Sequence, residues 1–462
     1  MQRENWGSKF GFIMAAAGSA VGLGNIWRFP YITGTNGGGA FVFVYVLCVI
    51  LIGAPLLFNE IGLGRLTKKN PFGAFRDTGA NYFWTFFGAI LGILVSFVVL
   101  SYYGVIAGWT IGYIFKSLMG IDTPFAEFAA NGGLIVALLA VFCVITAVIV
   151  IGGISGGIEK AAKILMPMLF VLLGVVIIRS VTLDGAGAGI DYYLNPDFSK
   201  ISGKTILAAL GQAFFSMSIG WGIMITYGSY LSKDSNIVNS GLWVGFLDAG
   251  VALLGGLMVF PAVFAFGKDP AAGPSLVFSV LPEVFSEMPG GSIVGAIFFL
   301  LLAVAALTSS ISMLEVPASY FIDEKKWNRK KSAIVVSIIV FLFGVPSALS
   351  FGGVDFLTNM SMPKLDGGMT GDGWFGILDY YFGTLFITVV ALATSLYVGW
   401  GMDIGRVSDE ISEGATIFTK PLVGSVTLKS IWVLFIKYVC PVVILLVFMD
   451  MIGLFGTAGE GG

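Results

Sequence analysis

Long apolar runs separated by short polar connections extend along almost the whole chain, from Phe10 to residue 455. Each run has about 20 residues or more, which is enough to cross the hydrocarbon core of a bilayer. The runs are apolar throughout and do not alternate, which favours membrane helices over barrel strands. The pattern predicts eleven membrane-spanning helices over 10–36, 40–64, 84–118, 134–152, 159–180, 204–232, 239–267, 291–322, 332–350, 374–402 and 429–455.

Composition supports the same class. The chain has 462 residues, of which 57% are hydrophobic and 11% charged, and its mean hydropathy is +0.93. A soluble domain has about a quarter charged residues, so the polar surface is too small to cover a soluble protein of this length. We expect a polytopic, all-α integral membrane protein. The first apolar run continues without a cleavage site, so we expect no cleavable signal peptide.

The basic residues indicate the orientation in the membrane. Most of the 25 lysines and arginines lie in connections on the same side as the N-terminus, and this bias assigns that side to the cytoplasm. With eleven spans, the C-terminus is then extracellular. We expect a multi-pass protein of the plasma membrane in this orientation.

The sequence lacks the residues that several other functions require. The three cysteines lie in apolar runs at no metal-ligand spacing, which is typical of buried packing residues. The sequence contains no histidine, the side chain best suited to a proton relay near neutral pH. No basic patch suits nucleic acid, and no convergent set of titratable residues indicates an enzyme.

Two of the predicted spans are interrupted by glycine and polar residues. The first carries GSAVGLGN (18–25) and the sixth carries SMSIGWG (216–222). Close helix packing would explain a single glycine, but two clusters at matching positions favour broken helices at the midplane site of a transporter. Because the clusters are five spans apart, the second copy of the unit would be inverted. We expect one transmembrane domain over 1–462, with repeats at about 10–180 and 204–402 and an additional helix at 429–455.

A broken helix has a chemistry of its own. It exposes carbonyl groups at the end of one half and N–H groups at the start of the next. The half-helix dipoles then attract a cation at one end and an anion at the other. Such a site can bind a zwitterion together with Na⁺ while using few charged side chains. Freed backbone groups are costly in lipid, so they must face a ligand or water.

Specific motifs carry a resemblance to a known family. They are AGSAVGLGNIWRFPY (17–31), NGGGAF (36–41), GQAFFSMSIGWG (211–222), ITYGSYLSKD (225–234) and LTSSISMLEVP (307–317). At these residues the chain resembles the neurotransmitter:sodium symporter family, and within it bacterial amino-acid transporters such as the leucine transporter and the multi-hydrophobic amino acid transporter. The resemblance covers about residues 3–404 and implies the leucine-transporter-type fold, a 5+5 inverted repeat with helices 1 and 6 broken.

The resemblance implies two sodium sites with oxygen ligands. Besides the substrate carboxylate, the first site would use Ala20, Asn25, Ser216 and Asp248. The second would use carbonyls of Gly18, Val21 and Ala305 with hydroxyls of Thr308 and Ser309. Without the partner motif on the first span, these two hydroxyls would more often bond back to their own helix.

The resemblance also implies a binding site for an amino acid. Its carboxylate would meet the amides near Leu23 and Gly24 and the Tyr103 hydroxyl. The residues that would surround the substrate are Ala20, Val21, Gly22, Leu23, Gly24, Val99, Tyr103, Phe215, Ser216, Ser218, Trp221, Ser309 and Met313. Trp221 stands where the leucine transporter resemblance would place Phe. We expect a neutral, hydrophobic or aromatic L-amino acid, and the choice between aliphatic and aromatic stays open.

Charged residues at both ends of the site match the positions of gate residues in the family that the chain resembles. An arginine within a span is costly and usually faces water or an acid. The resemblance implies that Arg28 pairs with Asp379 as an outer gate. The residues implied at the inner gate are Arg3 with Asp323, and Trp6 with Tyr230. Solvated loop charge is the alternative for the pair at positions 3 and 323.

Asp248 departs from the commoner pattern of the family, which has an asparagine beside the first sodium. Tyr45, Gln212 and Ser216 match the chloride-site positions of animal relatives. A carboxylate beside Na⁺ is held ionised by the cation and could replace the anion, so we expect that chloride is not required. Whether Asp248 also exchanges a proton stays open.

The sequence therefore predicts a sodium-coupled symporter that imports its amino acid by alternating access. Its expected partners are the amino acid and the bilayer, with no nucleic acid, while sodium stoichiometry and oligomeric state stay open. A non-transporting sensor of the same fold is an alternative, but it would be expected to lose Asn25 or the LTSS hydroxyls, which are present. A symporter for another small zwitterion is a further alternative. A pore fits less well, because gate pairs on both sides favour an occluded site.

Overall fold

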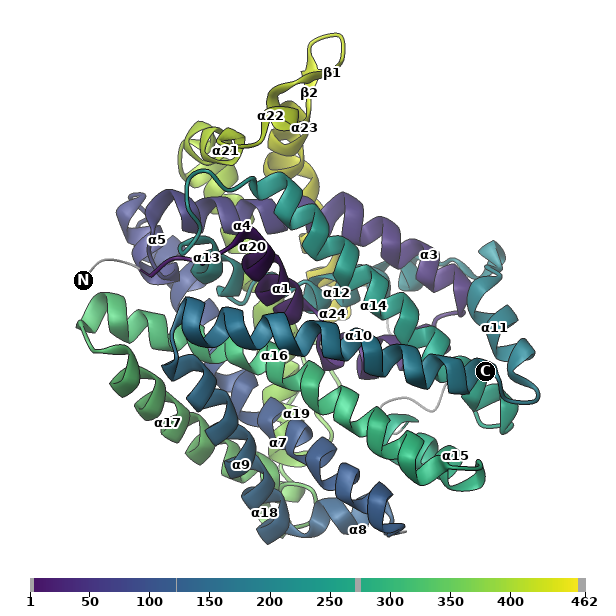
Figure 1. Ribbon diagram of the computed structural model, residues 1–462. Coiled ribbons are helices and arrows are strands. Elements are labelled where there is room, and N and C mark those ends of the chain that lie inside the picture. The colour runs from purple at the N-terminus through teal and green to yellow at the C-terminus, as the bar shows by residue number, and fades with distance from the viewer. Residues whose placement is uncertain (1–3, 122, 271–275, 456–462) are drawn as a thin grey trace.

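The computed structural model describes residues 4–121, 123–270 and 276–455, which form a bundle of helices (Figure 1). Helices occupy the position of every predicted span. In this part of the chain, nine helices are long and apolar enough to cross a membrane, and the bent pair of the first span makes a tenth. The predicted sixth span is divided into two short helices that do not pass this test. The count of eleven is therefore not confirmed by length and hydropathy.

The first half of the chain holds five spans in the predicted order. Their elements are α1 (Lys9–Ala20), η1 (Gly24–Arg28) and α2 (Phe29–Thr35); α3 (Gly39–Cys48), η2 (Val49–Gly53) and α4 (Ala54–Thr67); α6 (Tyr82–Thr85), η3 (Phe86–Ile90) and α7 (Leu91–Met119); α9 (Gly132–Ile151); and η4 (Ile154–Glu159) with α10 (Lys160–Val181). All the η elements named here are π-helical stretches, which continue the helix beside them.

The second half holds the other six. Their elements are α12 (Gly203–Ser216) and α13 (Ile223–Gly228); α14 (Ile237–Ala265); α16 (Gly291–Lys325); α17 (Arg329–Leu349); α19 (Gly373–Tyr380), η7 (Tyr381–Leu385), α20 (Phe386–Leu396) and η8 (Tyr397–Gly401); and α23 (Leu428–Leu434), η9 (Phe435–Val439) and α24 (Cys440–Met451). Several spans begin at a polar residue whose side chain accepts from a free N–H of the first turn, as at Ser8, Asn131, Asn236 and Asn328.

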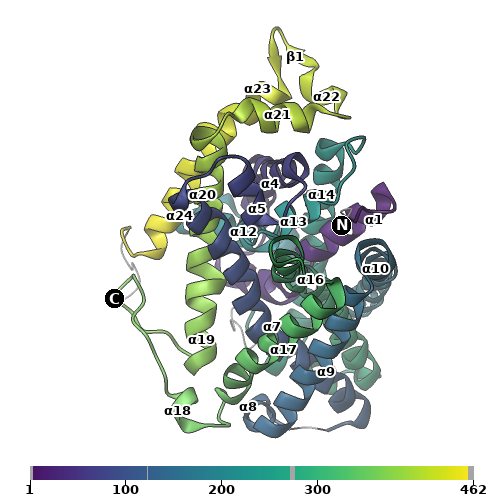
Figure 2. The same cartoon turned by 90° about the vertical axis from the view of Figure 1, so that its left-hand side faces the viewer.

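The connections contain more structure than the hydrophobic pattern predicts. They include α5 (Pro71–Asp77), α8 (Phe125–Ala130), α11 (Ala186–Leu194), η5 (Phe198–Lys200), η6 (Leu276–Val280), α15 (Leu281–Glu287), α18 (Asp355–Thr358), α21 (Ile404–Ser412), α22 (Thr416–Thr419) and the hairpin of β1 (Pro421–Val423) with β2 (Val426–Thr427). These elements are too short for a span-length window. Figure 2 shows α21, α22 and the hairpin beyond one end of the bundle.

The helices pack as two groups, one of which contains the broken helices. α7, α9, α16 and α17 pack against one another, and α1, α4, α13 and α14 pack as a second group. Because α1 and α13 also contact α16, the interrupted segments face the first group across the middle of the molecule. The three cysteines are free and buried, as predicted.

Candidate functional site

The interruption of helix 1 lies between Ala20, where α1 ends, and Gly24, where the π-helical stretch begins. The two parts meet at an angle of 48°. The Gly22 amide donates to Asn25 Oδ1 at 3.1 Å, and the Leu23 amide donates to the Tyr103 hydroxyl at 3.2 Å. The structure thus brings together two of the three donors that were predicted to meet the substrate carboxylate.

The interruption of helix 6 covers residues 217–222, where Ser218, Gly220 and Gly222 have φ values of +55°, +83° and +71°. Left-handed backbone at these positions cannot continue a right-handed helix. The Gly220 amide donates to Glu60 Oε1 at 2.8 Å, and Glu60 is 2% exposed. The Trp221 carbonyl accepts from Ser96 Oγ at 2.6 Å. The broken helices expected at these two positions are confirmed.

Glu60 was not predicted as a functional residue. It lies on α4 inside an apolar span, and a carboxyl group in such a span is itself a signal of function. That signal could have found it in the sequence.

Three of the predicted ligands of the first sodium site form one buried cluster. Asn25 Nδ2 donates to Ser216 Oγ at 3.0 Å and to Asp248 Oδ1 at 2.7 Å, and Ser216 Oγ donates to the same carboxylate oxygen at 2.7 Å. The other Asp248 oxygen accepts from Tyr45 at 3.2 Å. Among the described residues, no basic side chain pairs with this carboxylate, which is 0% exposed. A buried ionised carboxylate needs a compensating cation, so this cluster fits Na⁺.

Gln212 lies beside this cluster and contacts a different group. Its Nε2 donates to the Gly24 carbonyl at 2.9 Å, where the π-helical stretch begins. Its Oε1 has no hydrogen-bond partner within the described part of the chain. Tyr45 and Ser216, by contrast, both donate to the Asp248 carboxylate. The carboxylate thus occupies the hydroxyl donors that a bound anion would otherwise use.

The predicted ligands of the second sodium site converge from α1 and α16. Thr308 Oγ1 lies 2.9 Å from the Ala305 carbonyl and 3.4 Å from that of Val21. Ser309 Oγ lies 3.5 Å from the Gly18 carbonyl. A cavity of about 10 Å³ lies beside Gly18 and Thr308, about the smallest that holds one water molecule. Of the five predicted ligands, Gly18 and Thr308 line this cavity, and neutral oxygens of this kind fit a hard monovalent cation.

The residues predicted to line the substrate pocket come from the two interruptions and the helix turns beside them, from α7 and from α16. Val99, Tyr103, Ser218, Trp221 and Met313 are all buried, and the Phe215 and Trp221 rings meet edge to face at 5.7 Å. Gly22 allows the helix 1 interruption to lie close to α16, because a Cβ at this position would collide with the Ser309 hydroxyl.

Two serines that were not predicted join the broken helices to α16. Ser19 Oγ lies 2.7 Å from Ser312 Oγ and 3.3 Å from Ser218 Oγ. Ser218 Oγ also donates to the Ser19 carbonyl at 3.1 Å. Serine is common in membrane helices, so the sequence alone did not distinguish Ser19 or Ser312 from packing residues.

The structure places Arg28 and Asp379 near each other without an ion pair. The guanidinium of Arg28 lies over the Phe215 ring, with Cζ 4.4 Å from the ring centroid. Asp379 Oδ1 accepts from the Tyr102 hydroxyl at 2.9 Å. The outer-gate pair therefore stays a prediction, and Phe215 is one of the side chains that Arg28 contacts.

The inner-gate residues are described only in part, because Arg3 lies outside the described residues. Asp323 accepts from the Asn70 amide at 2.9 Å and from Asn70 Nδ2 at 3.1 Å. The Trp6 amide donates to the Tyr230 carbonyl at 3.2 Å, and the two rings are 6.4 Å apart. Trp6 and Tyr230 thus lie in contact, as the resemblance implies.

A second acidic residue in a span, Glu315, organises the same end of the site. Arg329 binds its carboxylate through two nitrogens, at 2.7 and 3.1 Å, and the Tyr230 hydroxyl donates to it at 2.6 Å. Arg329 also pairs with Glu4 at 2.7 Å. These bonds join the N-terminal segment and the end of helix 6 to α16 and α17. Glu315 stands within the motif LTSSISMLEVP, but it was not predicted to act.

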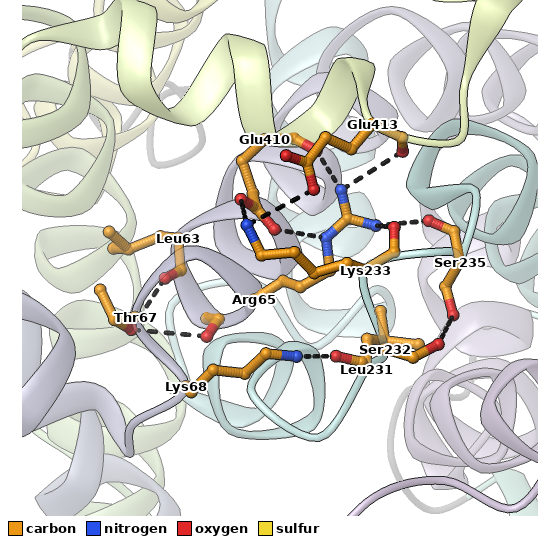
Figure 3. Close-up of polar contacts among 11 residues, drawn as sticks. Leu63, Arg65, Thr67, Lys68, Leu231, Ser232, Lys233, Ser235, Glu410 and Glu413 are labelled. Atoms are coloured by element: carbon orange, nitrogen blue, oxygen red, sulfur yellow. Dashed lines mark hydrogen bonds and ion pairs between the residues drawn. The ribbon is translucent and has the colours of Figure 1, made fainter.

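A separate buried cluster around Arg65 holds the group of α4 and α13 together (Figure 3). Arg65 is 0% exposed, and its Nε pairs with Glu410 Oε1 of α21 at 2.7 Å. Its other nitrogens donate to backbone carbonyls, including that of Ser235 beyond the end of helix 6. A fully buried guanidinium with this many acceptors ties α4, the 231–235 connection and α21 into one unit.

Comparisons with known proteins identify the family of the chain. The sequence model of the "Sodium:neurotransmitter symporter family" matches residues 3–129 and 125–458. The "Uncharacterized sodium-dependent transporter YhdH" of Bacillus subtilis is 38% identical over 97% of this chain and 98% of its own length. An uncharacterized sodium-dependent transporter of Haemophilus influenzae is 36% identical over the same shares. The crystal structure of MhsT in complex with L-phenylalanine is similar with a TM-score of 0.85 and 40% identity, covering 97% of this chain and 100% of MhsT.

Proposed function

Because the chain belongs to the sodium:neurotransmitter symporter family, we propose that it imports a neutral hydrophobic or aromatic L-amino acid together with Na⁺ by alternating access. Membership makes it a sodium-dependent, multi-pass membrane transporter and not an enzyme. The observation that carries the proposal is the convergence of both helix interruptions on one buried site that contains Asn25, Ser216 and Asp248.

The site offers a zwitterion what each of its ends requires. The Leu23 and Gly24 amides and the Tyr103 hydroxyl lie at the start of a half-helix and would bind the carboxylate. Carbonyls near Ala20 and Phe215, at the ends of the other half-helices, would bind the ammonium group.

The side chain of the amino acid would enter the space among Val99, Phe215, Trp221 and Met313. These four side chains are apolar and largely buried, so the pocket favours a hydrophobic or aromatic group. MhsT, at 40% identity, has been crystallised with L-phenylalanine, which supports this class of substrate.

Two Na⁺ ions would couple transport to the sodium gradient. The first would lie among Ala20, Asn25, Ser216 and Asp248 and would also contact the substrate carboxylate, so each ligand would strengthen binding of the other. The second would lie among the neutral oxygens contributed by α1 and α16. There it would hold the two helices together and favour one conformation of the transporter.

Chloride would not be required, since Asp248 supplies a fixed negative charge beside the first ion. In the variant Asp248→Asn, we expect uptake to fall and to become partly restored by chloride. Unchanged uptake that is still insensitive to chloride would contradict this part of the proposal.

Alternating access would proceed by changes at the two ends of the site. Towards the outside, Arg28 would exchange its contact with Phe215 for an ion pair with Asp379. Towards the cytoplasm, the bonds of Glu315 with Tyr230 and Arg329 would break when the pathway opens inward. In this proposal the protein lies in the plasma membrane with its N-terminus in the cytoplasm and its C-terminus outside, as the basic residues of the connections indicate.

Proteoliposomes test the proposal directly. An inward Na⁺ gradient should drive accumulation of a labelled amino acid, and competition by twenty unlabelled amino acids should rank the substrates. Ser309→Ala should raise the Na⁺ concentration for half-maximal uptake by about tenfold, because it removes a polar ligand of a cation. Ser310→Ala is the matched control, since within the described part of the chain that hydroxyl bonds only to the Ala306 carbonyl of its own helix.

Each alternative predicts a different result. Binding without accumulation of any amino acid would favour a sensor, and accumulation of another small zwitterion would change the substrate class. Equal effects of the two serine variants would contradict the assignment of the second sodium site.

A further inference from the structure

An apolar groove of about 350 Å³ lies outside the predicted substrate site. Residues of α7, α16 and α17 line it, and these three helices pack together (Figure 1). Leu94, Pro317, Phe321 and Ile339 are among its lining residues, none of which is charged. Leu94 and Ile339 are 42% and 44% exposed, so the groove opens away from the core. Its volume is that of a small-ligand pocket.

The groove lies near one end of the bundle. It is formed by the end of η3 and the first turns of α7, the last turns of α16 and the second and third turns of α17. The turn that joins α16 to α17 is therefore nearest to this end of the groove. Residues 323–331 in and around this turn include five basic and two acidic side chains, so the rim of an apolar groove is positively charged.

Two aromatic contacts connect the groove wall to cations at the rim. On one side, Phe321 stacks on Trp327 at 4.8 Å, and Lys331 Nζ lies 4.2 Å from the Trp327 ring. On the other side, Tyr320 meets Phe72 at 5.7 Å, and Arg76 lies over Phe72 at the same distance.

The two cations differ in what else they bind. Arg76 pairs with Asp77 at 2.8 Å and also with Glu324, so the protein already neutralises its charge. Lys331 is exposed and forms no ion pair within the described residues. Lys331 is thus the cation that an anionic ligand would reach from the groove.

We propose that this groove binds an anionic phospholipid of the surrounding membrane, with an acyl chain against Leu94, Pro317 and Phe321 and the phosphate at Lys331. A phospholipid is apolar at one end and anionic at the other, which matches the groove and its rim. Basic residues directly beside a membrane span attract anionic headgroups, and an indole such as that of Trp327 favours the interface. The inference depends on the location in a membrane and not on the identity of the transported amino acid.

Native mass spectrometry of the intact protein provides the first test, with phosphatidylglycerol and phosphatidylcholine of identical acyl chains at equal concentration. We expect the anionic lipid to be retained preferentially. Lys331→Gln should reduce this preference by about fivefold, the effect of one lysine near an anionic lipid. Lys420→Gln, which removes an exposed lysine next to the β1–β2 hairpin, is the charge control and should change nothing.

A variant that fills the groove distinguishes the contribution of the acyl chain to binding from that of the headgroup. Leu94→Trp should lower the retention of both lipids, whereas Ile145→Trp should not, because Ile145 is a 39% exposed apolar residue of α9 that does not line the groove. All four substitutions are at exposed positions, and equal melting temperatures would verify folding.

Phosphatidylglycerol with a photoreactive acyl chain locates the lipid-binding site independently. Labelling should concentrate in peptides that contain Leu94 and residues 317–339. Equal retention of the two lipids, equal effects of Lys331→Gln and Lys420→Gln, or labelling spread evenly over α9 and α24 would each overturn the proposal.

Discussion

Helices 1 and 6 are both interrupted in the middle of the molecule, but the two interruptions are held in place by different means. In helix 1 the gap between Ala20 and Gly24 contains no residue with positive φ. In helix 6, residues 217–222 include three left-handed positions, at Ser218, Gly220 and Gly222. The first interruption therefore depends on its neighbours, and the second is imposed by its own backbone.

The partners of the two interruptions differ in the same way. In helix 1, the freed amides of Gly22 and Leu23 donate to predicted site residues, Asn25 and Tyr103. In helix 6, the freed groups bond to Glu60 and Ser96, which were not predicted to bind ligand. Substitutions at the helix 1 interruption should therefore impair binding, whereas those at the helix 6 interruption should impair folding first.

The largest effect is expected for Gly220→Ala. A side chain at φ +83° costs about 1–2 kcal/mol, and the added Cβ would also collide with the Ile387 carbonyl, which is backbone and cannot move aside. We expect little folded protein, as measured by size-exclusion chromatography and melting temperature. Gly211→Ala is the matched control, because a Cβ at this helical glycine meets open space. It should be neutral or slightly stabilising, since Ala is the better helix former.

The next effect is expected for Gly22→Ala, the corresponding change at the helix 1 interruption. Here the Cβ would meet the Ser309 hydroxyl and, at 3.1 Å, the Tyr103 hydroxyl, both of which are predicted site groups. We expect folded protein with about 100-fold lower sodium-dependent uptake, because a displacement of about 1 Å at a binding site has an effect of this size. Loss of folding in this variant, or normal uptake, would contradict the distinction between the two interruptions.

A smaller effect on stability is expected when Glu60 is replaced by alanine. Glu60→Ala leaves the buried Gly220 amide without its acceptor, and an unsatisfied buried donor costs about 1–3 kcal/mol. The melting temperature should fall whether or not Na⁺ and substrate are present. Glu60→Gln retains an acceptor oxygen and should recover most of the loss. If the alanine variant melted like the wild type, Glu60 would have no role in holding the helix 6 interruption.

The sequence predicted the positions of both interruptions, because glycine and polar clusters stand out within an apolar run. It did not separate their mechanisms, since GSAVGLGN and SMSIGWG are both rich in glycine, and glycine adopts negative as readily as positive φ values. Spans were located to within a few residues, whereas short elements such as α5 and α21 were missed. They have too few residues for a periodic pattern to emerge.

The residues predicted around Asp248 and Ser309 lie close together in the structure, because each motif supplies several neighbouring groups. Their roles as ligands stay predictions. The contact of Arg28 was not predictable in the same way. A long side chain at the edge of a cavity can reach either Phe215 or Asp379, and local sequence does not decide between them. Glu60 and Glu315 were missed although acids in apolar spans are a recognised signal.

The smallest effect, at Ser218, tests the comparison most finely. Ser218→Gly removes the strain of φ +55° but also the bond from its hydroxyl to the Ser19 carbonyl. These terms are each about 1 kcal/mol and oppose each other, so stability should change little. Ser218→Ala loses the bond and keeps the strain, and should melt at a lower temperature than the glycine variant. At Ser19, inside α1, the order should reverse, because glycine in a regular helix is less stable than alanine by about 1 kcal/mol. If alanine were the more stable replacement at both positions, the helix 6 interruption would not be imposed by its own backbone.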